Sequence, residues 1–340
     1  MALLSMFHAA ARRLPGACLA RWRAAGLALA TALGTALGSS AAAAQPADCP
    51  PPLQLPSAEQ TQQLAAQARD RGVLWRLDKD GRSLWLYGTL HLGQPGWLFP
   101  GPTVAAALAA AEVLALEVDL SDPAVARATA QGMAALPQPP ALPAGLAPRL
   151  AALAAADCVQ DPGFARQHPL LQALALTVSA ARRDGLEPGF AQEVALTLQA
   201  RRNGQAIVSL ERPAEQLGAL VPATPRELVP MIDSLVTQLE SGRLRQQLGR
   251  LAQLWSDGDL ATLGRYGDWC GCADTDEDRL LLQRLNDARN PALAARIAAL
   301  HGQGRSVFAA VGALHMTGPQ ALPLLLAQQG FAVTPLLPAP

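Results

Sequence analysis

The stretch LYGTLHLG at residues 86–93 returns in nearly the same form as AVGALHMTG at residues 310–318. Each copy is an apolar run, a glycine, a histidine three residues after that glycine, and a further glycine shortly after. A glycine lets the backbone bend sharply at the end of a strand and lets a ligand approach it closely. We therefore interpret both copies as strands that carry a histidine to their carboxyl ends. The residues concerned are Gly88, His91, Gly312 and His315.

The segments around the first copy predict strands and a helix of an α/β fold. Two runs rich in Leu, Trp and Val flank the turn DKDG at 78–81, which predicts a β-hairpin. A helix over about 102–111 and a short buried strand over 113–118 follow. Strand, helix and strand form a βαβ unit, for which parallel pairing is expected.

The middle of the chain is mainly helical. Between about 121 and 300 a single strand, 205–211, interrupts the helical pattern, and the stretch 226–256 is amphipathic. After the second histidine, a helix over 319–329 and a terminal strand complete the pattern. We predict an α/β sheet with a large helical insertion at about 121–300.

Polar side chains follow four of the apolar strands. His91 and His315 end the two similar copies, and Glu117 and Glu211 end the strands at 113–118 and 205–211. Ligand sites in open α/β sheets lie at the carboxyl ends of strands, so these side chains are expected to converge.

Two imidazoles and a carboxylate are typical ligands of a divalent metal site with open positions. We predict that His91, His315 and Glu117 bind one Zn, Mn or Co ion, and that Glu211 acts as general base or holds a ligating histidine. Such an ion lowers the pKa of bound water and polarises a carbonyl, as hydrolysis at neutral pH requires. The sequence has no G-x-S-x-G elbow, so a serine nucleophile has no direct support.

Structural roles explain the same residues without a function. A histidine after a strand is often a loop residue with a satisfied hydrogen bond. Asp119, next to Glu117, fits a helix cap, and Glu211 fits a pair with Arg212 or a cap for the helix at 213.

The first 44 residues resemble a signal peptide. Four arginines precede an apolar, acid-free run at 24–37, and small residues follow, with a cleavage site near Ala44. A membrane anchor is the alternative, but the run is short and mostly alanine. We predict an exported protein, periplasmic or secreted, with no stable membrane span after cleavage and a Pro-rich linker at 45–60.

Four cysteines remain after cleavage: Cys49, Cys158, Cys270 and Cys272. An even number in an oxidising compartment predicts two disulfides. A bridge between Cys270 and Cys272 would close a very small ring, so we expect each to pair with Cys49 or Cys158. A zinc site is the rival interpretation, although Cys270-Gly-Cys272 lacks the usual spacing and a nearby histidine.

Length and composition set the outer limits. The chain has 340 residues, 50% of them hydrophobic and 16% charged, with a formal net charge of zero. This length is sufficient for a sizeable core. The lack of a basic run argues against nucleic-acid binding.

Taken in order, five segments resemble the TraB/GumN family, which is related to the Tiki metalloproteases and more distantly to erythromycin-esterase and ChaN-like proteins. The resemblance covers roughly 74–337. It rests on LWRL…LWLYGTLHLG, AEVLALEVDL, GQAIVSLERPAEQL, LNDARNPALAARI and VFAAVGALHMTGPQALPLLLAQQGFAV. It implies a central mixed sheet built from two similar halves, each lending a G-x-x-H to a common site.

The resemblance also carries over site residues. His91 and His315 match the two motif histidines, and Glu117 matches the acid after the second strand. Glu211 and Gln216 match a Leu-Glu…Gln element, with Arg212 where a threonine is common. Arg289 and Asn290 match an Arg-Asn pair suited to binding a substrate carboxylate or a developing oxyanion.

The leading expectation is therefore an exported metal-dependent hydrolase that cleaves a peptide or a related amide or ester bond. One alternative is a non-catalytic periplasmic protein that sequesters a peptide or a haem-like ligand. Another is a metal-independent esterase with His91 as general base.

Overall fold

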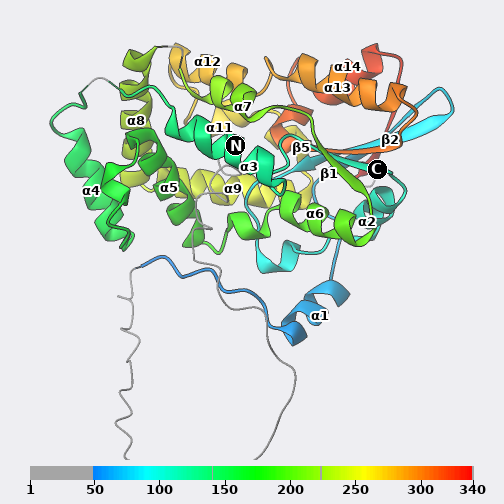
Figure 1. Cartoon of the computed structure of the whole chain (residues 1–340), viewed down its shortest axis with the longest axis horizontal. Helices are drawn as coiled ribbons and strands as arrows, with labels where there is room; N and C mark the ends of the chain where they lie inside the picture. The colour runs from blue at the N-terminus through cyan, green and yellow to red at the C-terminus, as the bar shows by residue number, and fades with distance from the viewer. Residues whose placement is uncertain (1–48, 140, 223, 339–340) are drawn as a thin grey trace, which may run out of the picture.

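The computed structural model describes residues 49–139, 141–222 and 224–338 (Figure 1). Its centre is a six-stranded mixed sheet with the order β4-β3-β5-β2-β1-β6. The strands are β1 (Val73–Lys79), β2 (Arg82–Thr89), β3 (Val113–Leu116), β4 (Ala206–Ser209), β5 (Val307–Gly312) and β6 (Ala332–Leu337).

Four neighbouring strands, β4, β3, β5 and β2, run parallel, while β1 runs antiparallel to both β2 and β6. The predicted hairpin is confirmed as β1 and β2, paired from Lys79 with Arg82. Its two turn residues, Asp80 and Gly81, have φ angles of 52° and 71°. Positive φ at both central positions is the conformation that Asp-Gly turns favour, so this dipeptide fixes the register of the hairpin.

Fourteen α-helices occur in the described residues, and short 3-10 helices join several of them. The α-helices are α1 (Ala58–Ala66), α2 (Pro102–Ala109), α3 (Pro123–Ala134), α4 (Leu146–Ala156), α5 (Pro169–Arg182), α6 (Gln192–Arg202), α7 (Pro213–Leu220), α8 (Pro225–Glu240), α9 (Arg243–Asp257), α10 (Leu260–Leu263), α11 (Tyr266–Trp269), α12 (Asp276–Leu285), α13 (Asn290–Gly302) and α14 (Leu322–Gln328). The 3-10 helices are η2 (Pro95–Trp97), η3 (Phe164–Arg166), η4 (Pro188–Phe190) and η5 (Ala313–Met316).

Helices cover both faces of the sheet. Successive side chains of a strand point to opposite faces, and the central strands carry apolar side chains on both. In β5, Phe308 and Ala310 belong to the core that packs against α2, α6 and α9. Val307, Ala309 and Val311 belong to the core that packs against α13 and α14. Figure 1 shows α13 and α14 on one side of the strands and α2 and α6 on the other.

A third core lies within the helical insertion. It joins α4, α5 and α8 through Leu150, Leu174 and Ile232, all buried. Figure 1 shows these three helices at one end of the molecule, away from the strands. The predicted helical stretch 226–256 is two helices, α8 and α9, separated at Gly242, where φ is 69°.

The predicted strands exist, but their order differs from the simplest expectation. β2 and β3 are parallel, as the βαβ unit predicts, yet β5 lies between them and pairs with both. The two glycine-histidine copies therefore lie on adjacent strands, with Thr89 opposite Gly312. The structure does not show two similar halves; it shows one sheet, whose strands β3 and β5 are separated by helices and by β4.

The expected disulfide pairing is wrong, although two disulfides are present. Cys49 pairs with Cys158, and Cys270 pairs with Cys272, with Cα–Cα distances of 5.6 and 5.0 Å. The short ring closes because Gly271 between the two cysteines has a φ of 57°, a left-handed conformation open to glycine. Both Cα–Cα distances lie within the range that a disulfide spans.

Within the described part of the chain, no helix is long and apolar enough to cross a membrane. The predicted signal peptide at 1–44 lies outside the described residues. The linker at 45–60 is described from Cys49 onward, and α1 begins at Ala58 after a capping box formed by Ser57 and Gln60.

Gly93, the last residue of the first copy, offers a test of the fold. It exchanges two main-chain hydrogen bonds with Glu187, of 2.9 and 2.8 Å, and a Cβ there would lie 1.8 Å from the main-chain oxygen of Phe190. We expect Gly93→Ala to lower the free energy of unfolding by about 3 kcal/mol. The Gly93 segment and the segment from Glu187 to Phe190 cannot move apart to make room for the methyl group without losing these hydrogen bonds. Gly96→Ala is the control, since its Cβ meets nothing within 4 Å. Equal urea midpoints for the two variants would contradict this packing.

Candidate active site

The four predicted strand-end side chains lie together at one edge of the sheet. Glu211, Glu117, His315 and His91 follow β4, β3, β5 and β2, which are neighbours in that order. All four residues are buried, with at most 5% of their surface exposed. The convergence predicted from the sequence is therefore present, and it follows from the parallel direction of these strands.

Arg289 ties this cluster together. It lies just before α13 and is itself buried. Its Nε donates to Glu211 at 3.0 Å, and its Nη2 donates to Glu117 at 2.5 Å and also to Glu211. Its Nη1 donates to the main-chain oxygen of Leu285 at 2.9 Å and to His315 Nε2 at 3.1 Å. These contacts use all five N–H donors of the guanidinium group.

Both oxygens of Glu117 accept further hydrogen bonds. Oε1 accepts from the main-chain nitrogen of Gly312 at 2.8 Å, and Oε2 accepts from Gln216 at 3.1 Å. Burial by itself raises the pKa of Glu117, but the charge of Arg289, together with the two histidines and the Gly312 N–H, holds the pKa below its usual range. Glu117 is therefore an ionised carboxylate in the folded protein.

His315 is held as a neutral imidazole in one tautomer. Its Nε2 faces a guanidinium group, which can only donate, so the ring proton is on Nδ1. Nδ1 in turn donates to Asn290 Oδ1 at 2.5 Å, while Asn290 Nδ2 donates to the main-chain oxygens of His315 and Gln320. Burial, reinforced by the charge of Arg289 against the opposing charge of Glu117, lowers the pKa of His315 to about 3.

His91 has a different environment. Its Nδ1 lies 2.9 Å from Glu193 Oε1, and its Nε2 lies 3.8 Å from Glu117 Oε1. The same Glu193 oxygen accepts from the Thr89 hydroxyl at 2.5 Å. Burial lowers the pKa of His91, but Glu193 and Glu117 together raise it above its usual value. With Nδ1 held by Glu193, Nε2 is the nitrogen that is free to exchange a proton.

Glu193 is the residue of this cluster that the sequence interpretation missed. It lies in the first turn of α6, next to Gln192, which accepts a hydrogen bond from the main-chain nitrogen of Leu90 at 2.9 Å. An acid in the first turn of a helix is common for reasons of the helix dipole alone. The sequence therefore offers no signal that separates Glu193 from an ordinary helix start.

The motif glycines leave room for these contacts. A Cβ at Gly312 would lie 3.2 Å from Glu117 Oε1 and 3.6 Å from His91 Nε2 and from His315 Cδ2. A Cβ at Gly88 would lie 2.6 Å from the Val73 side chain and 3.2 Å from the Cα of Ala313. Gly312 keeps the centre of the cluster open, and Gly88 lets β2 and the segment after β5 approach each other.

A cavity of about 440 Å³ opens beside His91. It lies between the segment after β3 and helices α3 and α6, and His91, Glu117 and Glu193 form part of its wall. Its volume is typical of a small-molecule site. His315, Glu211, Arg289 and Asn290 do not line it. The cluster therefore has a front layer that contacts the cavity and a back layer that holds the front layer in place.

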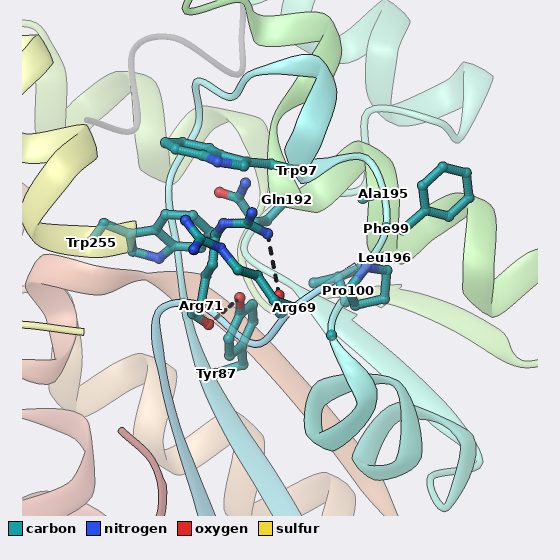
Figure 2. Close-up of a pocket in the computed structure, with 11 residues that line it drawn as sticks. Arg69, Arg71, Tyr87, Trp97, Phe99, Pro100, Gln192, Ala195, Leu196 and Trp255 are labelled. Carbon is teal, nitrogen blue, oxygen red and sulfur yellow. Dashed lines mark hydrogen bonds between the residues drawn. The ribbon is translucent and has the colours of Figure 1, made fainter. Parts of the chain in front are cut away.

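A second hollow, on the other side of Gln192, is much smaller. Its volume of about 20 Å³ is enough for about one water molecule. Figure 2 shows Trp97, Trp255 and Tyr87 around it, with hydrogen bonds from Tyr87 to the Arg71 main chain and from Arg71 to the Arg69 main chain. These side chains line the hollow together with Gln192, Ala195 and Leu196 of α6.

The predicted metal ligands converge, but their donor atoms do not form a three-ligand site in this arrangement. Both nitrogens of His315 are engaged, and the Glu117 carboxylate is bound by Arg289, Gln216 and the Gly312 main chain. Among the residues that the structure describes, no group of three or more His, Cys, Asp or Glu is arranged to hold a metal ion. Arg289 supplies positive charge at the place where the ion is predicted.

The model of the TraB/PrgY/gumN family matches residues 73–335. The match begins at the first residue of β1, ends within β6 and includes every residue of the cluster. No curated protein and no solved structure matches the chain.

The back layer predicts a large effect of Arg289 on stability. Arg289→Met leaves two buried carboxylates, Glu117 and Glu211, without their counter-charge, and we expect a loss of about 3–5 kcal/mol of unfolding free energy. Adding Glu117→Gln and Glu211→Gln should restore part of this loss. Arg76→Met, in an exposed ion pair, should cost less than about 1 kcal/mol. Urea unfolding measures all three, and an Arg289→Met variant as stable as Arg76→Met would refute the role of Arg289.

Proposed function

The chain belongs to the TraB/PrgY/gumN family, and from this membership and the buried cluster we propose that it is an exported hydrolase of a peptide or a related amide or ester bond. One observation carries the proposal. His91, whose Nδ1 lies 2.9 Å from Glu193 Oε1, lines a cavity large enough for a small substrate. A histidine oriented by a carboxylate is a common arrangement for general acid and base catalysis.

In the proposed reaction, a water molecule in the cavity attacks the carbonyl carbon of the substrate. His91 Nε2 accepts a proton from this water while the new C–O bond forms. The same proton then passes to the leaving nitrogen or oxygen as the C–N or C–O bond breaks. Glu193 stabilises the imidazolium ion that exists between the two steps, because its carboxylate lies 2.9 Å from Nδ1.

The other predicted site residues act through these groups. Arg289 has no free donor for a substrate carboxylate or an oxyanion, since its five N–H groups are bound within the protein. Glu211 is bound by Arg289, and Asn290 by His315. We therefore propose that Arg289, Glu211 and Asn290 are positioning residues, which fix Glu117 and the segment after β5.

Export is part of the proposal, because the signal-peptide pattern at 1–44 and the four cysteines of the remaining chain support an oxidising compartment. The two disulfides of the structure agree with this. N-terminal sequencing of the exported protein checks the processing site, which is expected near Ala44.

The raised pKa of His91 predicts the pH dependence of hydrolysis. A general base works only when deprotonated, so the rate should rise with pH through a pKa above the usual 6.5. Glu193→Gln keeps an oxygen beside Nδ1 but removes the charge, and it should move this limb to lower pH. His91→Gln should lower the rate by about 10²–10⁴.

The measurement is the pH profile of kcat/KM on a mixture of short peptides and on small esters. A limb that stays in place in Glu193→Gln would contradict the role of that carboxylate. If the wild type hydrolyses none of these compounds but still binds peptide or haem, the protein is a binding protein and the proposed activity fails.

A divalent ion stays a second candidate for water activation, and one observation favours it. Glu117 and Glu211 share a single guanidinium group, and a third carboxylate, Glu193, lies beside His91 in the same cluster. Buried charge without a counter-charge is unfavourable, so the cluster has capacity for more positive charge. Binding through His91, His315 and Glu117 requires Arg289 to release His315 Nε2.

Metal content of the purified mature protein tests this candidate. If Zn, Mn or Co binds through the predicted set, His91→Ala and His315→Ala should each lose the ion while the far-UV circular dichroism stays unchanged. His301→Ala is the control, because His301 contacts the main chain of Lys79 outside the cluster. Wild-type protein that retains no divalent ion at micromolar concentration would leave only the His91 mechanism.

A further inference from the structure

The cavity beside His91 combines apolar walls with two arginines. Val118, Leu120, Val194 and Leu198 are among its apolar lining residues. Arg127 of α3 and Arg201 of α6 also line it. Walls of this kind favour a ligand with an apolar body and a charged group at one place.

The acids of the cavity are already engaged, whereas the arginines are largely available. Asp119 accepts two hydrogen bonds from Ser121, one from its main-chain nitrogen and one from its hydroxyl. Glu117 and Glu193 are paired with Arg289 and His91. In contrast, Arg201 makes one long hydrogen bond, of 3.3 Å, to the main-chain oxygen of Ser121.

Arg127 is exposed and makes no ion pair or side-chain hydrogen bond within the described part of the chain. Arg127 and Arg201 therefore both have guanidinium donors available to a ligand in the cavity. Two guanidinium groups are well suited to a carboxylate, because each presents parallel N–H donors in one plane.

We propose that this cavity binds the carboxyl-terminal end of a short peptide. The free carboxylate contacts Arg127 and Arg201, and the apolar side chain of the last residue lies against Val118, Val194 and Leu198. The peptide bond that is hydrolysed is then one near the carboxyl terminus of the peptide, toward His91. This inference rests on the proposed hydrolase function for its reaction, but not for the binding itself.

The reaction is ordinary hydrolysis of that bond. Water adds its oxygen to the carbonyl carbon, and His91 transfers the proton to the leaving nitrogen as the C–N bond breaks. The carboxyl-terminal product, with its new amino group, is at first still bound to the arginines through its carboxylate. No oxidant, reductant or second substrate is required.

Binding is measured first, by titration calorimetry with N-acetyl-leucine and with N-acetyl-leucine amide. The two probes have the same apolar body and differ in the carboxylate charge. We expect the acid to bind about tenfold more tightly, the effect of roughly one charged hydrogen bond. In the double variant with Arg127→Gln and Arg201→Gln, this preference should disappear.

Arg202→Gln is the matched control, because Arg202 neighbours Arg201 on α6 and is exposed but does not line the cavity. It should keep the preference for the acid. Equal affinity of the wild type for the two probes, or an equal loss of preference in Arg202→Gln, would overturn the inference.

Hydrolysis is measured second, on apolar tripeptides with a free or an amidated carboxyl terminus. Faster cleavage of the free acid in the wild type, but not in the double variant, supports the inference. Equal cleavage of both overturns it and leaves the proposed hydrolase standing. Charge-dependent binding without any cleavage supports the binding site and contradicts the hydrolase.

Discussion

The site depends on the hydrogen bonds that the five N–H donors of Arg289 make. Four of these donors bind Glu117 after β3, Glu211 after β4 and His315 after β5, and so connect the carboxyl ends of three parallel strands, while the fifth binds the main-chain oxygen of Leu285. The two carboxylates are buried, and a buried charge is tolerated when it is paired and hydrogen-bonded. One guanidinium group satisfies this requirement for both, and it also fixes the tautomer of His315.

From this anchor the site is built in two layers. The back layer, around Arg289, has no contact with the cavity and holds the Glu117 carboxylate in place. The front layer consists of Glu117, His91 and Glu193, and it meets the cavity wall. Burial lowers the pKa of both imidazoles. At His91 the carboxylates of Glu193 and Glu117 together raise the pKa above its usual value, whereas at His315 the charge of Arg289 adds to the effect of burial. Two histidines from nearly the same sequence phrase therefore have opposite protonation behaviour.

The helical insertion forms a core of its own and also contributes to the site. Its helices α3 and α6 supply eight of the 17 residues that line the cavity, Glu193 among them. The third core, in α4, α5 and α8, packs away from the strands (Figure 1). The sheet thus positions the chemical groups, and the inserted helices form the space in which a substrate is bound.

The sequence by itself determined the hairpin at Asp80-Gly81, the apolar strands, and the histidines and acids at their ends, because turn residues and apolar runs act over a few neighbouring positions. Tertiary structure alone decided which strands are neighbours, which cysteines pair, and that Glu193 holds His91. It also decided that Arg289 binds Glu117, from which it is 172 positions distant. Such contacts depend on how distant segments pack and on the conformation of single residues such as Gly271, and neither leaves a periodic pattern in the chain.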